Sequence, residues 1–309
     1  MSMHLVLQQI LVIFCYVAVG IGAGRLGIID PDQRKYLTKL CSSLILPFTI
    51  LSAASMEVDA EGFRSLGLAM GIMFLVMGGT MAVSLLLFRA AHAEDGFRTA
   101  MTSLITFPNC TFLGLPLCKA LFGEIAVLYN CAALIVFNVL FFTVQLPLFT
   151  GGKINLKAIL TVPTLTTVAL LVMLALGLHW PVPVQTVVSS IGSMITPLSL
   201  IIIGVMLSEN DLLAIFREKA VYLVMALRNF LLPALAMLVL MAVPMNPQDK
   251  LCVLVYLACP CATLTTIYSI QTDIQPELCA HSVLFSTISF AISLPVVIAA
   301  GQLLFGVLY

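Results

Sequence analysis

The chain has 309 residues, of which 61% are hydrophobic and 9% are charged, and its 14 basic residues balance 14 acidic ones. A soluble domain carries roughly 25% charged and about 45–50% apolar residues, so a soluble globule could not hide this many apolar side chains. The balanced charge gives no indication of a nucleic-acid partner. We therefore expect a polytopic membrane protein whose main solvent is lipid.

The first apolar stretch, residues 5–29, has no basic segment before it and is longer than the apolar core of a signal peptide. We expect it to be retained as a membrane helix. A bilayer core about 30 Å thick needs about 20 apolar residues per helix, and nine more such runs follow. The ten expected spans are 5–29, 37–56, 65–88, 99–122, 125–149, 157–178, 184–207, 220–243, 250–271 and 278–307.

The basic residues predict the orientation of these helices, because cytoplasmic loops collect lysine and arginine. Loops after odd-numbered helices hold ten basic residues, and loops after even-numbered helices hold three. The ten are Arg25, Arg34, Lys35, Lys39, Arg89, Arg98, Lys153, Lys157, Arg217 and Lys219. With the odd loops in the cytoplasm, both termini are expected outside it.

Prolines recur at a nearly constant spacing between the two halves of the chain. The pairs are Pro47 and Pro197, Pro108 and Pro260, and Pro147 and Pro295, at offsets of 150, 152 and 148 residues. This pattern predicts two repeats of five helices, residues 1–150 and 151–309. Because five is odd, the second repeat enters the bilayer from the opposite face, which gives the inverted repeat typical of secondary transporters. The expected fold class is therefore all-α, with ten transmembrane helices.

Helices four and nine each carry a proline near mid-membrane, in the segments SLITFPNCTFLGLPL and LVYLACPCATLTTIYSIQ. Proline lacks an N–H and clashes with the carbonyl four residues back, and the freed backbone groups cannot face lipid. Two broken helices at equivalent repeat positions are typical of a transporter substrate site, where half-helix N-termini suit a carboxylate. The alternative is a pair of ordinary proline kinks packed against neighbouring helices.

Around these prolines the chain resembles the auxin efflux carrier family, which includes the plant PIN-type carriers. The matching segments are Pro108–Asn109 with Gly114-Leu115-Pro116, the stretch from Pro260 through Tyr268 and Asp273 to Ser286-Thr287 and Leu294-Pro295, ILPFTILSAAS, and PLSLIIIGVML at 197–207. The resemblance spans nearly the whole chain. The chain departs from the family in its short GGKINLK loop and in the CPC of residues 259–261.

The resemblance implies a fold like that of the bile-acid sodium symporters. Helices one, two, six and seven would form a scaffold, which would also mediate a homodimer. Helices three to five and eight to ten would form a transport domain that moves like an elevator. Helices four and nine would cross at their prolines, and the substrate would bind at this crossing.

The candidate substrate-binding residues are Pro108, Asn109, Cys110, Asn138, Gln145, Arg228, Pro260, Cys261 and Thr263. The Asn109 amide could donate to a carboxylate or cap the second half-helix. Asn138 and Gln145 are seven residues apart and share a helix face, although polar residues in membrane helices also simply bond a neighbouring helix. Thr263 could line the pathway or bond back to its own helix.

Arg228 is the only basic residue well inside an apolar run. Charges within the membrane are costly and indicate a functional site by default. Its depth of about 11 Å from the helix end also permits snorkelling to the cytoplasmic interface. Both interpretations stay open at this point.

The sequence shows no pattern for a metal, a cofactor or an enzyme. A soft-metal site around Cys259 and Cys261 would need more thiolates or histidines than Cys110 supplies, and the cysteines are expected to pack as small apolar side chains. The four histidines lie at expected helix ends or loops, without metal or catalytic spacing. We expect no bound metal, no cofactor and no enzymatic activity.

These observations lead to one hypothesis and one alternative. We expect a secondary transporter that moves a small organic anion, an auxin-like carboxylate or a dicarboxylate, across a bacterial-type cytoplasmic (inner) membrane. The alternative is a membrane-embedded sensor or receptor that uses the same pocket without transport. The expected partners are the anion, the lipid bilayer and a second copy of the chain, with no nucleic acid.

Overall fold

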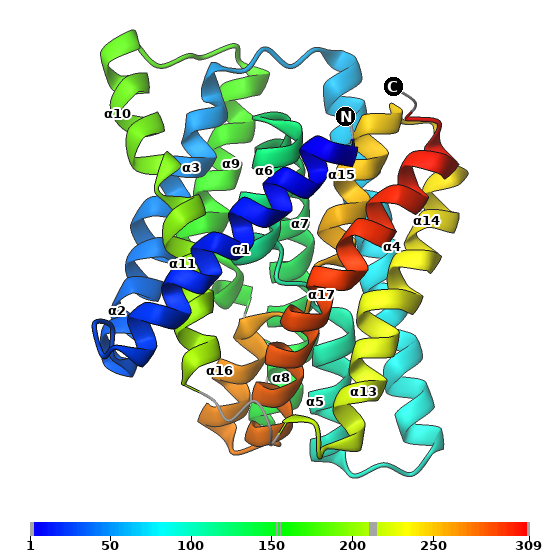
Figure 1. The fold of residues 1–309 in the computed structure, drawn as a ribbon. Coiled ribbons are helices and arrows are strands. Elements are labelled where there is room, and N and C mark those ends of the chain that lie inside the picture. Colours follow the sequence, from blue (N-terminus) through cyan, green and yellow to red (C-terminus); the bar gives the residue numbers. More distant parts are fainter. Residues whose placement is uncertain (1–2, 153, 155, 210–214, 308–309) are drawn as a thin grey trace. The chain divides into compact units, whose positions relative to one another are not determined.

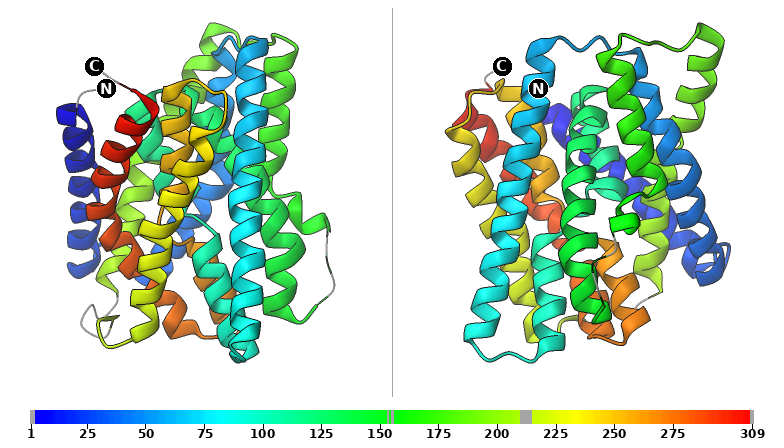
Figure 2. Two further views of the ribbon diagram at one scale, coloured as in Figure 1. Left: turned by 90° about the vertical axis from the view of Figure 1, so that its right-hand side faces the viewer. Right: turned by 180° about the vertical axis from the view of Figure 1, so that it is seen from behind.

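The computed structural model describes residues 3–152, 154, 156–209 and 215–307, and within them every regular element except one isolated β-bridge is helical (Figures 1 and 2). The α-helices are α1 (Met3–Arg25), α2 (Pro31–Leu40), α3 (Leu46–Ser52), α4 (Ala60–Ala90), α5 (Asp95–Thr106), α6 (Leu115–Phe122), α7 (Ile125–Leu140), α8 (Leu146–Thr150), α9 (Val162–Ala175), α10 (Val182–Ser193), α11 (Ile195–Ser208), α13 (Lys219–Met225), α14 (Leu232–Met241), α15 (Pro247–Ala258), α16 (Thr263–Thr272) and α17 (Pro276–Phe305). The π-helical turns are η1 (Cys41–Ile45), η3 (Cys110–Gly114), η4 (Phe141–Gln145) and η6 (Ala226–Leu231). The 3-10 turns are η2 (Ala53–Ser55) and η5 (Leu156–Ile159).

Within the described residues, six helical segments are long and apolar enough to cross a membrane, judged by length and composition. They are Pro31–Ser55, Ala60–Ala90, Ile125–Thr150, Val182–Ser208, Lys219–Met241 and Pro276–Phe305. Helices also occupy the other four expected spans, as α1, α5 with α6, α9, and α15 with α16. The all-α architecture is therefore confirmed, whereas the exact ten-span inverted repeat stays a prediction.

Four helical segments of the described residues contain a π turn, and each π turn is followed at once by a Leu-Pro pair. The pairs are Leu46-Pro47 after η1, Leu115-Pro116 after η3, Leu146-Pro147 after η4 and Leu232-Pro233 after η6. A proline ring clashes with the carbonyl four residues back, and a wider turn moves that carbonyl away. After η1, η4 and η6 the leucine N–H accordingly bonds the carbonyl five residues back. The prolines are thus accommodated without ending the helix.

The helices form two compact units. The first comprises Met1–Leu66, Thr111–Cys131 and Leu160–Leu212, and the second comprises Gly67–Cys110, Ala132–Ile159 and Leu213–Tyr309. Neither unit is a continuous half of the chain, because each gathers segments from both sides of residue 150. The division into two sequence repeats, and into scaffold and transport helices, stays a prediction.

In the first unit, α1 packs against α11 through small residues that face each other (Figure 1). A Cβ on Gly20 would overlap a backbone carbonyl of α11, and a Cβ on Gly204 would overlap one of α1. One turn further along, a Cβ on Gly24 would overlap the side chain of Ser208. Small residues four apart on both helices let the backbones touch, which is how membrane helices gain packing energy where lipid supplies no hydrophobic driving force.

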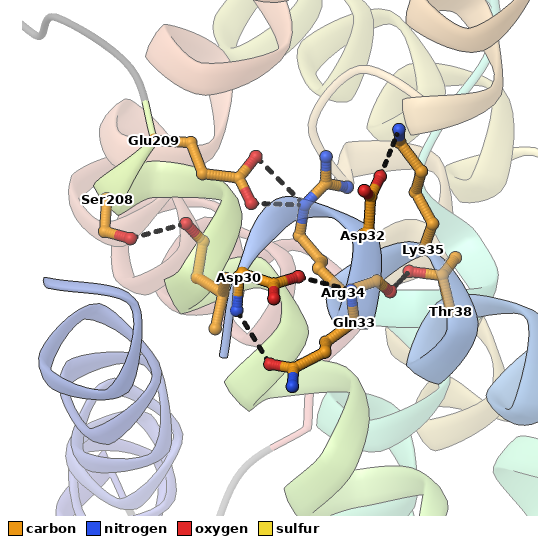
Figure 3. Close-up of polar contacts among 9 residues, drawn as sticks. Asp30, Asp32, Gln33, Arg34, Lys35, Thr38, Ser208 and Glu209 are labelled. Carbon is orange, nitrogen blue, oxygen red and sulfur yellow. Dashed lines mark hydrogen bonds and ion pairs between the residues drawn. The ribbon is translucent and has the colours of Figure 1, made fainter. Parts of the chain in front are cut away.

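A polar cluster joins the start of α2 to the end of α11 in the same unit (Figure 3). The Arg34 Nε donates to both carboxylate oxygens of Glu209, at 2.8 and 3.0 Å. Asp30 and Gln33 form a reciprocal capping box, and Pro31 occupies the first helical position. The capping box determines where α2 begins, and the ion pair determines which helix end it meets.

In the second unit, α17 contacts α5, α13, α14, α15 and α16 (Figures 1 and 2). One face of α17 carries a buried serine every third or fourth residue, at Ser282, Ser286, Ser289 and Ser293. The Asn229 Nδ2 donates to the Ser286 carbonyl at 2.8 Å and to the Ser289 Oγ at 2.7 Å. The small hydroxyl face therefore allows close approach of neighbouring helices and supplies polar partners for them.

Replacing Gly20 by alanine is expected to lower the Tm of the purified protein, because the added methyl group meets the backbone of α11. Overpacking of this kind costs about 1–3 kcal/mol. The matched control is Gly22→Ala on the same helix, where a Cβ meets nothing within 4 Å and alanine is the better helix former by about 1 kcal/mol. Thermal unfolding followed by size-exclusion chromatography compares the two variants. An equal Tm for both would contradict the close contact of α1 with α11.

Candidate functional site

Helices four and nine are both interrupted at their central prolines. The helix α5 ends at Thr106 and Phe107 is extended, while α15 ends at Ala258 and Cys259 is extended. Helical structure resumes at Cys110 and at Thr263. We call residues 107–110 and 259–262 the crossing. The prediction that both helices break at these prolines is confirmed.

The two extended stretches pair with each other as a minimal antiparallel ladder, and the ladder lies entirely within the second unit. Pro108 and Cys261 form the bridge, the Asn109 N–H donates to the Pro260 carbonyl at 2.7 Å, and the Ala262 N–H donates to the Phe107 carbonyl at 2.9 Å. In this register Pro108 and Cys261 form a pair without mutual backbone hydrogen bonds. The missing N–H of Pro108 therefore costs the ladder nothing.

Side chains add further links between the half-helices. The Cys261 N–H, which points away from the ladder, donates to the Ser286 Oγ at 3.1 Å. The hydroxyls of Ser103 and Thr265 lie 2.8 Å apart and join α5 to α16. The Asn109 Nδ2 donates to the Thr263 Oγ1 at 3.3 Å. The crossing brings Pro108, Asn109, Pro260, Cys261 and Thr263 together, as the sequence predicts.

Arg228 reaches the crossing from η6 and is 2% exposed. Its Nε donates to the Cys259 carbonyl at 2.9 Å and its Nη2 to the Leu257 carbonyl at 2.7 Å. Its Nη1 donates to the carbonyls of Ile105 and Thr106 at 3.1 and 3.4 Å. The guanidinium thus does not snorkel toward an interface. Four bonds from a group with five N–H donors make it a clamp on the backbone of both broken helices.

The position of the guanidinium has an electrostatic consequence. The carbonyls that it binds lie at the C-terminal ends of α5 and α15, each of which carries about half a negative charge. One cation therefore offsets both helix ends. The positive N-terminal end of α16 starts at Ala262, which has no side chain that could cap it. The helix ends at the crossing are consequently unbalanced toward positive potential, an arrangement that can attract an anion.

Asn138 and Gln145 are buried residues of the second unit. Gln145 lies in η4 and its Nε2 donates to the Thr99 carbonyl at 2.9 Å. Thr99 lies seven residues before the end of α5, about 10 Å along the helix, so this hydrogen bond ties Gln145 to α5 and not to the crossing. Asn138 is 8% exposed on α7, and its role in binding stays a prediction.

An aromatic cluster that the sequence did not single out lies beside the crossing. The Phe107 ring lies 5.0 Å from that of Phe137 and 5.1 Å from that of Phe141, measured between ring centroids. Tyr268 on α16 lies 5.5 Å from Phe141. The only available signal was the spacing of Phe137 and Phe141, one helical turn apart. Such a cluster can hold the apolar part of a small molecule next to a polar site.

The three cysteines of the crossing are buried thiols. Cys110 is 3% exposed, and Cys259 and Cys261 are fully buried. The Cys259 thiol donates back to the Val255 carbonyl at 3.3 Å. Within the described residues, no three side chains of His, Cys, Asp or Glu gather in a way that could hold a metal ion.

The comparison with protein families decides the class of this molecule. A family model described as membrane transport protein matches residues 5–154 and 145–298, which together cover nearly the whole chain. This chain belongs to the auxin efflux carrier family of membrane transport proteins. Membership in this family confirms the resemblance and makes the protein a multi-pass membrane transporter. Among the curated proteins, none matches the chain significantly.

A cysteine at position 108 is expected to form a disulfide with Cys261 on mild oxidation of the folded transporter. Directly opposed residues of this kind lie about 4.5 Å apart between Cα atoms, which is within the disulfide range. Peptide mapping by mass spectrometry detects the 108–261 link. The control is Pro108→Cys combined with Cys261→Ser. Free thiols at both positions after oxidation of the folded protein would contradict the ladder.

Proposed function

We propose that this transporter is a secondary carrier for a small organic anion with a carboxylate group. One observation carries the proposal. Among the buried residues that the structure describes, Arg228 is the only charged one, and it clamps the crossing of the two broken helices. Because this cation offsets the negative ends of α5 and α15, the positive end of α16 is left uncompensated, which favours a negatively charged ligand over a cation.

The proposed contacts of the carboxylate are the Asn109 amide, the Thr263 hydroxyl and the free N–H groups at the start of α16. All three are hydrogen-bond donors or can act as one. The backbone of Pro108, Cys110, Pro260 and Cys261 would shape the site. Arg228 would act by offsetting the negative ends of α5 and α15, so that the positive end of α16 sets the potential at the site. The aromatic cluster around Phe107 would pack against the apolar part of the anion.

For the transport cycle we propose alternating access in which the crossing moves together with the unit that contains it. Support comes from the grouping of the crossing, Arg228 and the aromatic cluster in the second unit alone. An elevator-like motion against the scaffold helices, a homodimer through that scaffold, and residence in the cytoplasmic membrane are parts of the same proposal. The ten-to-three bias of basic residues supports placing both termini outside the cytoplasm.

Counterflow in proteoliposomes tests the proposal. Vesicles loaded with one unlabelled carboxylate are expected to take up the same labelled compound, for at least one of acetate, succinate and indole-3-acetate. Labelled choline is the cationic control and is not expected to enter. Saturable binding of a carboxylate without counterflow would favour a membrane-embedded sensor. Uptake of choline but of no carboxylate would overturn the assignment to anions.

Substitutions of Asn109 separate its two possible roles. Asn109→Ala is expected to insert normally, since loss of a polar group does not oppose membrane insertion. Loss of one substrate hydrogen bond at a buried site costs about 1–3 kcal/mol, so the affinity for the transported carboxylate falls roughly ten- to a hundredfold. Asn109→Asp is expected to be worse, because it sets a negative charge against the carboxylate.

The aspartate variant is the decisive one, since aspartate caps a helix N-terminus as well as asparagine does. Initial uptake rates over a range of carboxylate concentrations give the affinity of each variant. If Asn109→Asp transports like the wild type while Asn109→Ala does not, Asn109 is a helix cap and not a substrate ligand.

A further inference from the structure

The four carbonyls around Arg228 have the chemistry of a cation site. They come from the last turns of α5 and α15 and from Cys259, where backbone carbonyls lack partners within their own helices. Carbonyls at half-helix C-terminal ends are the groups with which transporters coordinate a coupling cation. Here every one of them accepts from the chain's own guanidinium. In the described residues, no ion pair joins Arg228 to a carboxylate.

We propose that Arg228 is a built-in cation, which permanently fills a carbonyl cradle that would otherwise bind a monovalent cation from solution. The cradle is the set of carbonyls of Ile105, Thr106, Leu257 and Cys259. Arg228 is therefore a positioning residue. It holds both helix breaks in register, and its fixed charge replaces the charge that a bound ion would bring.

The geometry of the cradle defines the cation that it accepts. The carbonyls receive bonds from three different nitrogens of one planar group, at 2.7 to 3.4 Å. They are therefore spread along the edges of a guanidinium and not gathered around a point. A bare alkali ion at the centre would not reach them all, whereas a free guanidinium ion reproduces the planar set of donors. The wild-type cradle, already filled, is closed to both.

The neighbouring residue supplies a matched control. Asn229 is also fully buried on η6, but its amide donates to α17, at Ser286 and Ser289, and not to the cradle. Removing either side chain creates a small buried defect next to unpaired backbone carbonyls or hydroxyls. Only the Arg228 defect has the shape and the charge preference of a cation site.

The experiment measures Tm for the purified full-length protein in low-millimolar guanidinium chloride, sodium chloride or choline chloride at constant ionic strength. The Tm of Arg228→Ala is expected to fall below that of the wild type, and guanidinium is expected to raise it by about 3 °C or more. Sodium should restore less, and choline nothing. The wild type and Asn229→Ala should not respond to guanidinium. No rescue of Arg228→Ala, or equal rescue of Asn229→Ala, overturns the proposal.

A second pair of variants applies if Arg228→Ala does not survive purification. Arg228→Lys keeps the charge, whereas Arg228→Gln keeps hydrogen-bond donors and loses the charge. The lysine variant is expected to be the more stable of the two, because only it can offset the two helix ends. Equal Tm for both variants would show that the cradle needs donors and not a cation, which also overturns the proposal.

The consequence for transport rests on the proposed anion carrier. Carboxylate uptake by the wild type should be the same in sodium and in choline buffers, and Arg228→Gln should raise KM at least about tenfold with little change in the maximal rate. Because the thermal measurement needs no substrate, guanidinium rescue without any carboxylate transport would refute the anion carrier and leave the cradle intact. Carboxylate transport by the wild type without guanidinium rescue of Arg228→Ala would refute the cradle and leave the anion carrier intact. Sodium-dependent uptake by the wild type would overturn the built-in cation.

Discussion

Pro108 and Pro260 are buried and open the backbone of two helices inside the protein, so every group that they free needs a partner within the chain. An unpaired backbone group there costs several kcal/mol. The crossing satisfies four of them by pairing its own two strands. The rest need partners from other elements, with Ser286 on α17 accepting from Cys261 and Arg228 on η6 donating to the helix ends. The packing of α17 and η6 against the crossing therefore follows from the two prolines.

The same requirement explains how a buried arginine is tolerated. An isolated ion in an apolar interior is expensive, and a carboxylate partner would repay the cost only with near-ideal geometry. Two helix C-termini at about half a negative charge each sum to roughly one charge, which matches one guanidinium. The arrangement leaves no net charge at that side of the crossing. The positive N-terminal end of α16 is then the uncompensated charge at the crossing. The interruption of the helices therefore gives the crossing a positive side.

The sequence was sufficient to predict the breaks and their partner residues, because proline acts on its own helix and its position is visible in the chain. The near-constant offset between Pro108 and Pro260 pointed to an encounter of the two segments, and Thr263 and Asn109 do meet there. The direction of Arg228 could not be predicted. Its partners lie 29 to 123 residues away in sequence, and a long side chain at that depth could equally have reached the interface.

The roles of Gln145 and of the aromatic cluster could not be predicted from the sequence either. By spacing alone Gln145 shares a helix face with Asn138, but Gln145 is the last residue of the π turn η4, and a turn of different pitch alters the face that a residue presents. Phe107, Phe137 and Phe141 are apolar residues in an apolar chain. Composition therefore cannot distinguish residues that lie beside the candidate site from residues of the packed core. Contacts between helices, and not patterns within one helix, decide these roles.

The density of bonds at the crossing constrains where motion can occur in the transport cycle. A ladder, a hydroxyl pair and a four-bond clamp join α5, α15, α16, α17 and η6 across the crossing. Loosening any one of them would leave buried polar groups without water to replace the lost partner. A local rearrangement of the crossing is thus costly, whereas displacement of the whole set breaks none of these bonds. The physical chemistry of the two proline breaks consequently favours a site that travels as a rigid piece over a site that opens in place.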